Sequence, residues 1–279
     1  MSGAGVNGSG DKAKTSLGKM RWIGRLRYFL ISFVVLFIVW EAMVRFFAVP
    51  VYLLPTPTVI WEEFSHRWPR IYDHTWVTAE EIVVGYLVAV AVSIPLALAV
   101  AYSRTMENTI YPIIVFLQIV PKIAIAPLFI IWFGFGFTPK VLLVFLLSFF
   151  PIVVAAIAGF KSIDDETMEL ARSTGAGQWM IFRKIRLPAA MPNIFTGLKV
   201  AAALSSTAAV VAEFVASDKG LGYLLLEYNG DLETPMVFAT IIVLSIVGLI
   251  VYYGVELIER LAIPWHVSQR SDGTGKQVI

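Results

Sequence analysis

The side chains with the clearest chemical potential are a few amide and ionisable groups inside long apolar stretches. Gln118, Lys122 and Glu213 are each embedded among aliphatic and aromatic residues. Charged groups are costly in such surroundings, so they are candidate functional sites. Lys122 follows Pro121 and has no acidic residue within one helical turn. Its ammonium group could attract an anion or pair with Glu213, and we take Gln118, Lys122 and Glu213 as candidates for a pore or gate.

Other polar residues in apolar stretches have simpler explanations. Glu41 and Arg45 are four residues apart, which predicts a structural ion pair on one helix face. Lys199 lies near the end of its apolar stretch, where a long cationic side chain can extend towards the membrane surface. The hydroxyl groups from Ser205 to Thr207 are expected to form hydrogen bonds within their own helix.

The sequence offers no pattern for covalent, metal or nucleotide chemistry. It contains no Cys, and its His residues lack the one-turn spacing of a helical zinc site: His66, His74 and His266. The segment 273–277 has Gln where a phosphate loop needs Ser or Thr, and no strand precedes it. We therefore expect no catalytic residue, metal or cofactor, and a protein that is not an enzyme. The net charge of +2 gives no indication of nucleic-acid binding.

Six apolar stretches are long enough to position these groups across a membrane. The chain is 58% hydrophobic and only 15% charged, whereas soluble domains are about 25% charged. A bilayer core needs about twenty apolar residues in a helix, because every backbone polar group must be paired internally. The predicted spans are 29–48, 82–102, 110–133, 141–160, 194–216 and 236–257. Three prolines predict that the third span is the most broken: Pro112, Pro121 and Pro127.

The distribution of Lys and Arg predicts the direction of the spans. With both termini in the cytoplasm, fifteen of the 22 Lys and Arg residues lie on cytoplasmic segments and four on outer segments. This division agrees with the positive-inside rule. The chain then has a disordered, basic cytoplasmic tail over 1–27, a transmembrane domain over 28–260 and a second cytoplasmic tail over 261–279.

The predicted cytoplasmic segment between the fourth and fifth spans, 161–193, has helical signals of its own. Ser162 and Asp165 form a capping-box pattern, and Gly175 stands where a first short helix would end. A second short helix follows, which is expected to close at Pro188. From periodicity alone, the segment is either a helix-turn-helix presented to the cytosol or an amphipathic helix lying on membrane lipid.

The same segment resembles the EAA loop of ATP-binding-cassette (ABC) importer permeases. In that pattern E-A-A is followed by three residues, G, nine residues and I-x-L-P. The matching residues, with one departure at Leu170, are Glu169, Leu170, Ala171, Gly175, Ile185, Leu187 and Pro188. Shorter motifs, such as Leu53 to Pro57 and Lys219 to Tyr223, resemble the branch of permeases for nitrate, sulfonates, taurine and bicarbonate. That branch also includes thiamine-pyrimidine and riboflavin permeases.

The resemblance implies an all-α permease of the type I importer fold, with six transmembrane helices in a bacterial inner membrane. It also implies that the loop binds a separate ATPase subunit, to which Glu169 offers a carboxylate and Ala171 permits close approach. Because each chain has one such loop, two ATPase subunits and a second copy of this chain are implied. An extracytoplasmic solute-binding protein, periplasmic or lipid-anchored, would deliver the solute, and ATP would drive alternating access.

Two other classes of protein are the alternatives to this interpretation. A secondary carrier driven by protons or sodium should have two halves with matching broken spans. The Pro-rich third span has no matching span in the other half of the sequence. A membrane-embedded enzyme would need a clustered nucleophile or metal set, which the sequence lacks. The sequence does not identify the solute, and only the resemblance favours the vitamin-precursor permeases of the branch.

Overall fold

All regular structure in the described part of this computed structural model is helical. The structure describes Tyr28 and residues 31–264. The predicted tail over 1–27, and that over 261–279 from residue 265 onward, lie outside these residues. In chain order the helices are a helix over 31–46, α2 (Pro57–Tyr102), α3 (Arg104–Ile119), η1 (Lys122–Ile125), α4 (Ala126–Phe133), α5 (Phe137–Phe160), α6 (Asp165–Ser173), α7 (Gln178–Ile181), η2 (Phe182–Arg186), α8 (Leu187–Ala216), α9 (Leu221–Gly230) and α10 (Thr234–Ala262).

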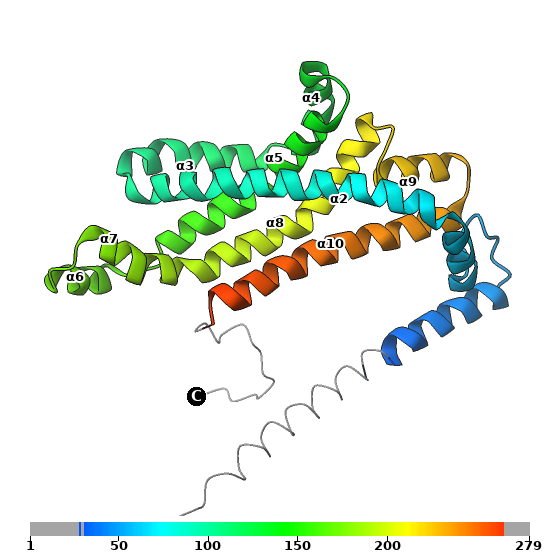
Figure 1. Ribbon diagram of the computed structural model, residues 1–279, viewed down its shortest axis with the longest axis horizontal. Helices are drawn as coiled ribbons and strands as arrows, with labels where there is room; N and C mark the ends of the chain where they lie inside the picture. Colours follow the sequence, from blue (N-terminus) through cyan, green and yellow to red (C-terminus); the bar gives the residue numbers. More distant parts are fainter. Residues whose placement is uncertain (1–27, 29–30, 265–279) are drawn as a thin grey trace, which may run out of the picture.

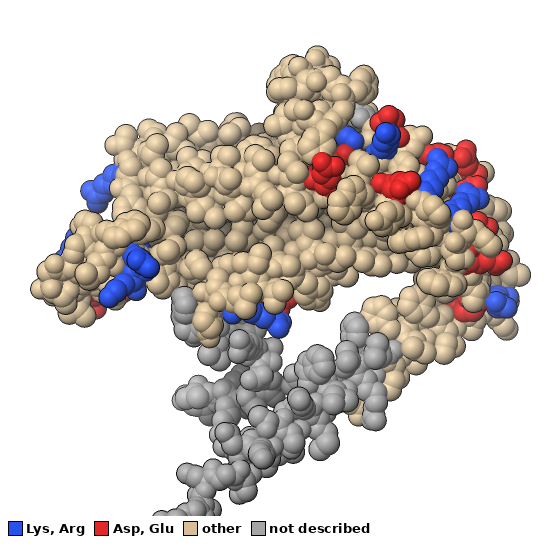
Figure 2. Space-filling view, in the orientation of Figure 1, with Lys and Arg blue, Asp and Glu red and all other residues tan. Residues whose placement is uncertain are grey.

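The long helices α2, α5, α8 and α10 run lengthwise in one bundle (Figure 1). Short helices α6 and α7 lie at one end of this bundle, which we call the loop end, and α9 lies towards the other, which we call the anchor end. On the face drawn in Figure 2, acidic and basic side chains gather towards the two ends and leave an apolar band between them. An apolar band of this kind suits the hydrocarbon core of a bilayer.

Four helices in the described residues are long and apolar enough to cross a membrane: Pro57–Tyr102, Phe137–Phe160, Gln178–Val215 and Thr234–Ala262. A fifth crossing is made if the pair Arg104–Ile119 and Lys122–Phe133, bent by 85°, counts as one span. The helix over 31–46 covers most of the predicted first span, 29–48, but is shorter than these helices. The all-α membrane fold is therefore confirmed, whereas the count of six spans stays a prediction.

The third predicted span is strongly bent, as its prolines indicate. α3 ends at Ile119, Pro121 precedes the short η1, and Pro127 lies in the first turn of α4. Proline has no backbone N–H and cannot continue the hydrogen-bond ladder of a preceding helix. The backbone around Lys122 is consequently irregular in the middle of an apolar stretch.

Several helices extend beyond the apolar stretches that predicted them. α2 begins at Pro57 rather than near residue 82, and its first turn is capped because the Thr56 hydroxyl accepts a hydrogen bond from the Val59 N–H at 3.4 Å. The helix predicted to begin at 194 is already continuous from Gln178. Hydropathy marks the part of a helix that lies in lipid, whereas caps and packing decide where the helix ends.

Glycines allow α5 to lie close to both α2 and α8. A β-carbon on Gly85 of α2 would lie 2.6 Å from the Val144 side chain of α5. A β-carbon on Gly197 of α8 would lie 2.6 Å from the Ala155 Cβ. In a membrane, close van der Waals packing of this kind holds helices together because lipid provides little hydrophobic drive between them.

Replacing Gly197 should therefore destabilise the bundle. We expect Gly197→Val to lower the free energy of unfolding by about 1–3 kcal/mol, the usual cost of overpacking. Gly254→Val is the matched control on α10, because nothing lies within 4 Å of its added β-carbon. Thermal unfolding of the two purified variants in detergent measures the difference, and equal midpoints would show that this contact is not important for stability.

Candidate functional site

Helices α6 and α7 form a helix-turn-helix with a small core of its own at the loop end. The short helices therefore hold each other in place, and the segment is not a single helix lying flat. Its core consists of three buried and three partly buried side chains: Met168, Ala171 and Ile181, and Ile163, Ala176 and Ile185.

Gly175 makes the turn between the two helices, as its position predicts. Its φ is +76°, in the left-handed region that glycine adopts without steric cost. Its N–H donates to the Arg172 carbonyl oxygen at 3.0 Å, which closes the end of α6. Nothing lies within 4 Å of the position that a β-carbon would take. The backbone conformation, rather than lack of space, is what requires glycine here.

A groove of about 360 Å³ lies between α6 and the helix formed by α7 and η2. Leu170 contributes to its wall and is 68% exposed, and Glu169 beside it is also exposed. Ala171 is only 7% exposed, so its small side chain permits close approach of α7 to α6 within the loop itself. The bulkier Leu170 is accommodated because it points away from the loop core.

Two local predictions for this segment are wrong. The Ser162 hydroxyl donates to the Gly159 carbonyl oxygen at 2.8 Å instead of forming a capping box, and Asp164 is the N-cap residue of α6. Pro188 does not close the second helix either. It occupies the first turn of α8, where proline is tolerated, and the five-residue π-helix η2 joins α7 to α8 without a break.

Lys122 and Gln118 come together at the bend of the third predicted span. The Lys122 ammonium donates to the Gln118 carbonyl oxygen at 2.7 Å and lies 4.6 Å from the centre of the Phe150 ring. Both residues line a cavity of about 390 Å³ formed by α3, η1, α5 and α8. Among the described residues, no carboxylate forms an ion pair with Lys122.

Glu213 lies apart from this cavity, and the possible pair between Lys122 and Glu213 is not formed. Glu213 is 1% exposed near the end of α8. Its carboxylate accepts a hydrogen bond from the Thr78 hydroxyl at 2.6 Å and another from the Gly222 N–H. The three candidate pore residues therefore belong to two different places in the bundle.

Side chains of α2, α5 and α8 hold the backbone leading into α9 and its first turn, in a cluster that we call the Glu213 anchor. Besides the two bonds to Glu213, Leu221 N–H donates to the Thr78 hydroxyl at 2.7 Å. Gly220 N–H donates to His74 Nδ1 at 2.9 Å, and the Lys140 ammonium donates to the Ser217 hydroxyl at 3.0 Å. The anchor consists of His74, Thr78, Glu81, Lys140, Glu213 and residues 217–222.

Glu81 and Lys140 form a buried ion pair that the sequence interpretation missed. Glu81 is fully buried, Lys140 is 6% exposed, and their charged atoms are in contact. The predicted spans began one residue after each of them, at 82 and 141, which placed both in outer segments. The spacing of His74, Thr78 and Glu81 along one helix face is the signal that could have indicated a buried polar stripe. In the described chain, no three His, Asp or Glu side chains could hold a metal ion.

For the remaining polar residues of the spans, the structure bears out some of the expected interactions and contradicts others. Glu41 and Arg45 form the predicted ion pair at 2.6 Å, and the Ser205 hydroxyl donates to the Ala202 carbonyl oxygen of its own helix at 2.7 Å. The expectation is wrong for Ser206, whose buried hydroxyl has no hydrogen-bond partner in the described structure. Lys199 does not extend to the surface. It pairs instead with Glu259 of α10 at 2.7 Å, because α8 and α10 pack side by side.

Residues 89–263 match the family described as binding-protein-dependent transport system inner membrane component. The chain belongs to this family, and it is a membrane permease subunit of an ABC importer. The match covers the bent span, the loop and the Glu213 anchor, except for the anchor residues of α2, which are His74, Thr78 and Glu81.

Three curated relatives cover most of the chain. The riboflavin transport system permease protein RibX of Chloroflexus aurantiacus is 33% identical over 85% of this chain and 90% of its own length. The formylaminopyrimidine transport permease protein ThiX of Halalkalibacterium halodurans is 32% identical, over 85% and 95% respectively. The taurine transport system permease protein TauC of Escherichia coli is 31% identical, over 78% and 81%.

A solved structure shows that the fold is that of a type I importer permease. An inward-facing structure of the MetNI methionine ABC transporter contains a chain with a TM-score of 0.59 and 17% sequence identity. The alignment covers 71% of this chain and 97% of that one. At this level of identity, the likeness supports the fold alone.

Removing the Glu213 carboxylate should release α9 from the bundle. We expect Glu213→Ala to expose Leu225, which is 8% exposed on α9, because two hydrogen bonds to the buried Glu213 side chain are lost. The chain has no Cys, so the rate of thiol labelling at Leu225→Cys measures this exposure, and we expect an increase of about tenfold or more. Glu227→Ala is the control, because Glu227 pairs at the surface with Arg70. Equal labelling in both backgrounds would contradict the anchoring role.

Proposed function

We propose that this permease carries a small solute across a bacterial inner membrane as one of two copies, with two ATPase subunits on the cytoplasmic side. A solute-binding protein would deliver the solute on the outer side, and the chain itself would do no covalent chemistry. The coupling element is the 161–193 loop, whose defining residues are Glu169, Leu170, Ala171, Gly175, Ile185, Leu187 and Pro188.

The single observation that carries this proposal is that the loop has a small apolar core of its own at one end of the bundle. Glu169 and Leu170 are exposed on α6, beside the groove between the two short helices. A carboxylate next to an apolar side chain suits a partner surface that offers a basic group beside an apolar cleft. Because the element has its own core, it can bind with little loss of conformational freedom.

The continuous helix from Gln178 to Val215 connects the loop to the anchor end of the bundle. Its 38 residues span roughly 55 Å at about 1.5 Å per residue. The groove lies at its start, and Glu213 lies near its end. We infer that a movement of the loop is carried along α8 to the Glu213 anchor, which then opens or closes the outer side during alternating access.

The charges at the loop end support a cytoplasmic location for the loop and for both termini. The segments at this end, 103–109 and 161–193, carry six Lys and Arg residues against four on the predicted outer segments, and the ion pair between Lys161 and Glu107 brings the start of α3 beside the loop. An excess of basic residues is typical of cytoplasmic segments. The basic residues in question are Arg104, Lys161, Arg172, Arg183, Lys184 and Arg186.

The solute class follows from the relatives and from the cavity at Lys122. The relatives' names give riboflavin, formylaminopyrimidine and taurine as transported compounds. We propose an organic solute of one of these classes, with an anionic or electron-rich group that Lys122 and Gln118 contact on its way through the bundle. The ammonium group faces the cavity and lacks a carboxylate partner among the described residues.

Gly175→Val should uncouple the loop from the ATPase. Positive φ costs a residue with a β-carbon about 1 kcal/mol or more, so the turn would distort and misplace Glu169. Gly177→Val is the matched control two residues away. Its φ of −65° suits any residue, and its β-carbon would meet nothing within 4 Å.

Both variants should reach the membrane in normal amount. We expect only Gly175→Val to lose the ATPase on co-purification, or to keep it without solute-stimulated hydrolysis in liposomes. If Gly175→Val and Glu169→Lys both behave like the wild type in binding, stimulation and uptake, the loop is not the coupling element.

Lys122→Met should lower the initial rate of solute uptake by about tenfold, which corresponds to about 1.4 kcal/mol. The change keeps an apolar stem but removes the charge that faces the cavity. Lys122→Arg keeps the charge and should retain most of the uptake. Co-purification of the ATPase should be normal for both, because Lys122 is distant from the loop in the fold. Normal uptake by Lys122→Met would show that this residue does not contact the solute.

A further inference from the structure

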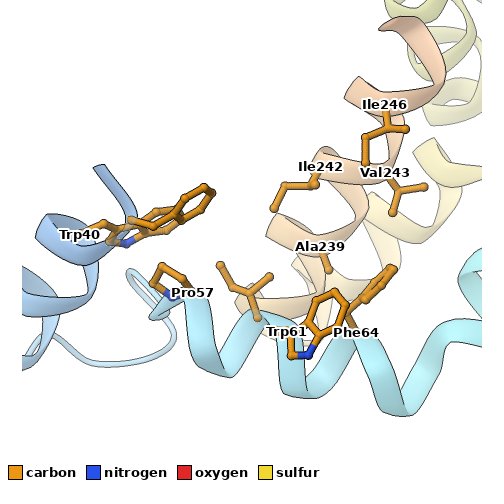
Figure 3. A pocket seen from close by; sticks show the side chains of 10 residues that line it. Trp40, Pro57, Trp61, Phe64, Ala239, Ile242, Val243 and Ile246 are labelled. Carbon is orange, nitrogen blue, oxygen red and sulfur yellow. The ribbon is translucent and has the colours of Figure 1, made fainter. Parts of the chain in front are cut away.

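The charged side chains that are buried in the described residues all belong to the Glu213 anchor. They are Glu81 of α2, Lys140 of α5 and Glu213 of α8. By contrast, the cavity of about 250 Å³ between the helix over 31–46, α2 and α10 is lined by apolar and aromatic side chains alone (Figure 3). The anchor is therefore the place in the bundle where buried charges must balance one another.

These three side chains form one contact network. The Lys140 ammonium contacts Glu81 and donates to the Ser217 hydroxyl at 3.0 Å. Thr78 lies one helical turn before Glu81, and its hydroxyl donates to Glu213 at 2.6 Å. The carboxyl groups of Glu81 and Glu213 are also within hydrogen-bond reach of each other. Two carboxyl groups and one ammonium group therefore share the same buried space.

The two carboxyl groups differ in their hydrogen bonds. Both oxygens of Glu213 have donors, because the Thr78 hydroxyl bonds to Oε1 and the Gly222 N–H to Oε2. In Glu81 the Lys140 ammonium contacts Oε1, and Oε2 is buried without a hydrogen-bond donor among the described residues. A buried carboxylate oxygen without a donor is costly. The missing donor must come from within the network.

The other charged residues around the anchor are exposed, paired or absent. Those next to it in the sequence are exposed: Glu80, Asp218 and Lys219. Glu227 of α9 pairs at the surface with Arg70. His74 Nδ1 accepts the Gly220 N–H, as an uncharged imidazole ring does. Helix α4 and residues 234–255 of α10 contain no charged side chain. With both buried carboxyl groups ionised, the network would therefore carry one uncompensated negative charge.

We propose that the Glu213 anchor is a proton-binding site, in which one proton is held between the carboxyl groups of Glu213 and Glu81. Two ionised carboxylates cannot form a hydrogen bond, because each can only accept. A protonated Glu213 carboxyl donates to Glu81, which stays ionised beside Lys140. The proton thereby joins α8 to α2 and leaves the buried network without net charge.

The proton makes the strength of the anchor depend on pH. When the anchor opens, both carboxyl groups reach water, where a glutamic acid is ionised at neutral pH, and the proton is released. The closed anchor therefore binds one proton more than the open anchor, so a rise in pH favours opening. This linkage involves neither the ATPase nor the solute.

Infrared spectroscopy of the purified full chain tests for the proton directly, because a protonated carboxyl group has a C=O stretch that a carboxylate lacks. We expect the wild type to show this band at neutral pH. Glu213→Gln and Glu81→Gln should each remove it. Glu227→Gln is the matched control, since Glu227 is an ion-paired carboxylate at the surface, and it should leave the band unchanged.

Thiol labelling at Leu225→Cys measures the effect of the proton on α9. Its rate is divided by the rate at Leu232→Cys, which is 70% exposed just after α9, so that ionisation of the thiol itself cancels. In the otherwise wild-type chain, this ratio should rise about tenfold or more between about pH 6 and about pH 9. Glu213→Gln keeps a donor that does not ionise, so it should remove most of the rise, whereas Glu227→Gln should retain it.

The proposal is overturned if the wild type has no protonated-carboxyl band, or if the band persists in both Glu213→Gln and Glu81→Gln. The same pH dependence of labelling in the wild type and in Glu213→Gln would also contradict it. The wild-type band requires no substitution, so the test does not depend on the variants folding normally. Neither readout uses the ATPase, and a negative result would leave the transport function untouched.

Discussion

The continuous helix from Gln178 to Val215 is the element on which the other features depend. Its first turns close the core of the loop, its middle packs against α5 at Gly197, and Glu213 near its end holds the first turn of α9. Neither Pro188 nor Pro192 interrupts it. A continuous helix that contacts a separate element at each end and packs closely between them is suited to convert a movement at one membrane surface into a movement at the other.

Each candidate site lies where this helix meets a less regular part of the chain. At the loop end the positive φ of Gly175 sets the angle between α6 and α7. In the middle, the bend of 85° after α3 brings Lys122 and Gln118 to a cavity that α8 also lines. At the anchor end, backbone N–H groups at 220–222 satisfy buried acceptors of α2 and α8. Regular helices supply the scaffold, and irregular backbone supplies the sites.

The sequence predicted well those features that arise from local chemistry. Apolar stretches located the four long apolar helices, the three prolines of the third predicted span indicated its bend, and Gly175 located the left-handed turn. Each of these features depends on one residue type or on a run of similar residues. It did not predict contacts between distant segments. The pairs Glu81–Lys140 and Lys199–Glu259 join residues about 60 positions apart, so only helix packing reveals them. Hydropathy also placed helix starts too late, because it measures contact with lipid and not hydrogen bonding.

The most direct test of this account is to lock the Glu213 anchor and measure transport. The Thr78 hydroxyl lies 2.7 Å from the backbone N–H of Leu221, so Thr78→Cys and Leu221→Cys put one thiol on each of two directly contacting segments of α2 and α9, in a chain with no other Cys. If the anchor must move during each cycle, the oxidised double variant in liposomes with its ATPase should bind that ATPase but fail to take up solute, and reduction should restore uptake. Equal uptake by the oxidised and reduced forms, with the disulfide shown to be formed, would contradict the account.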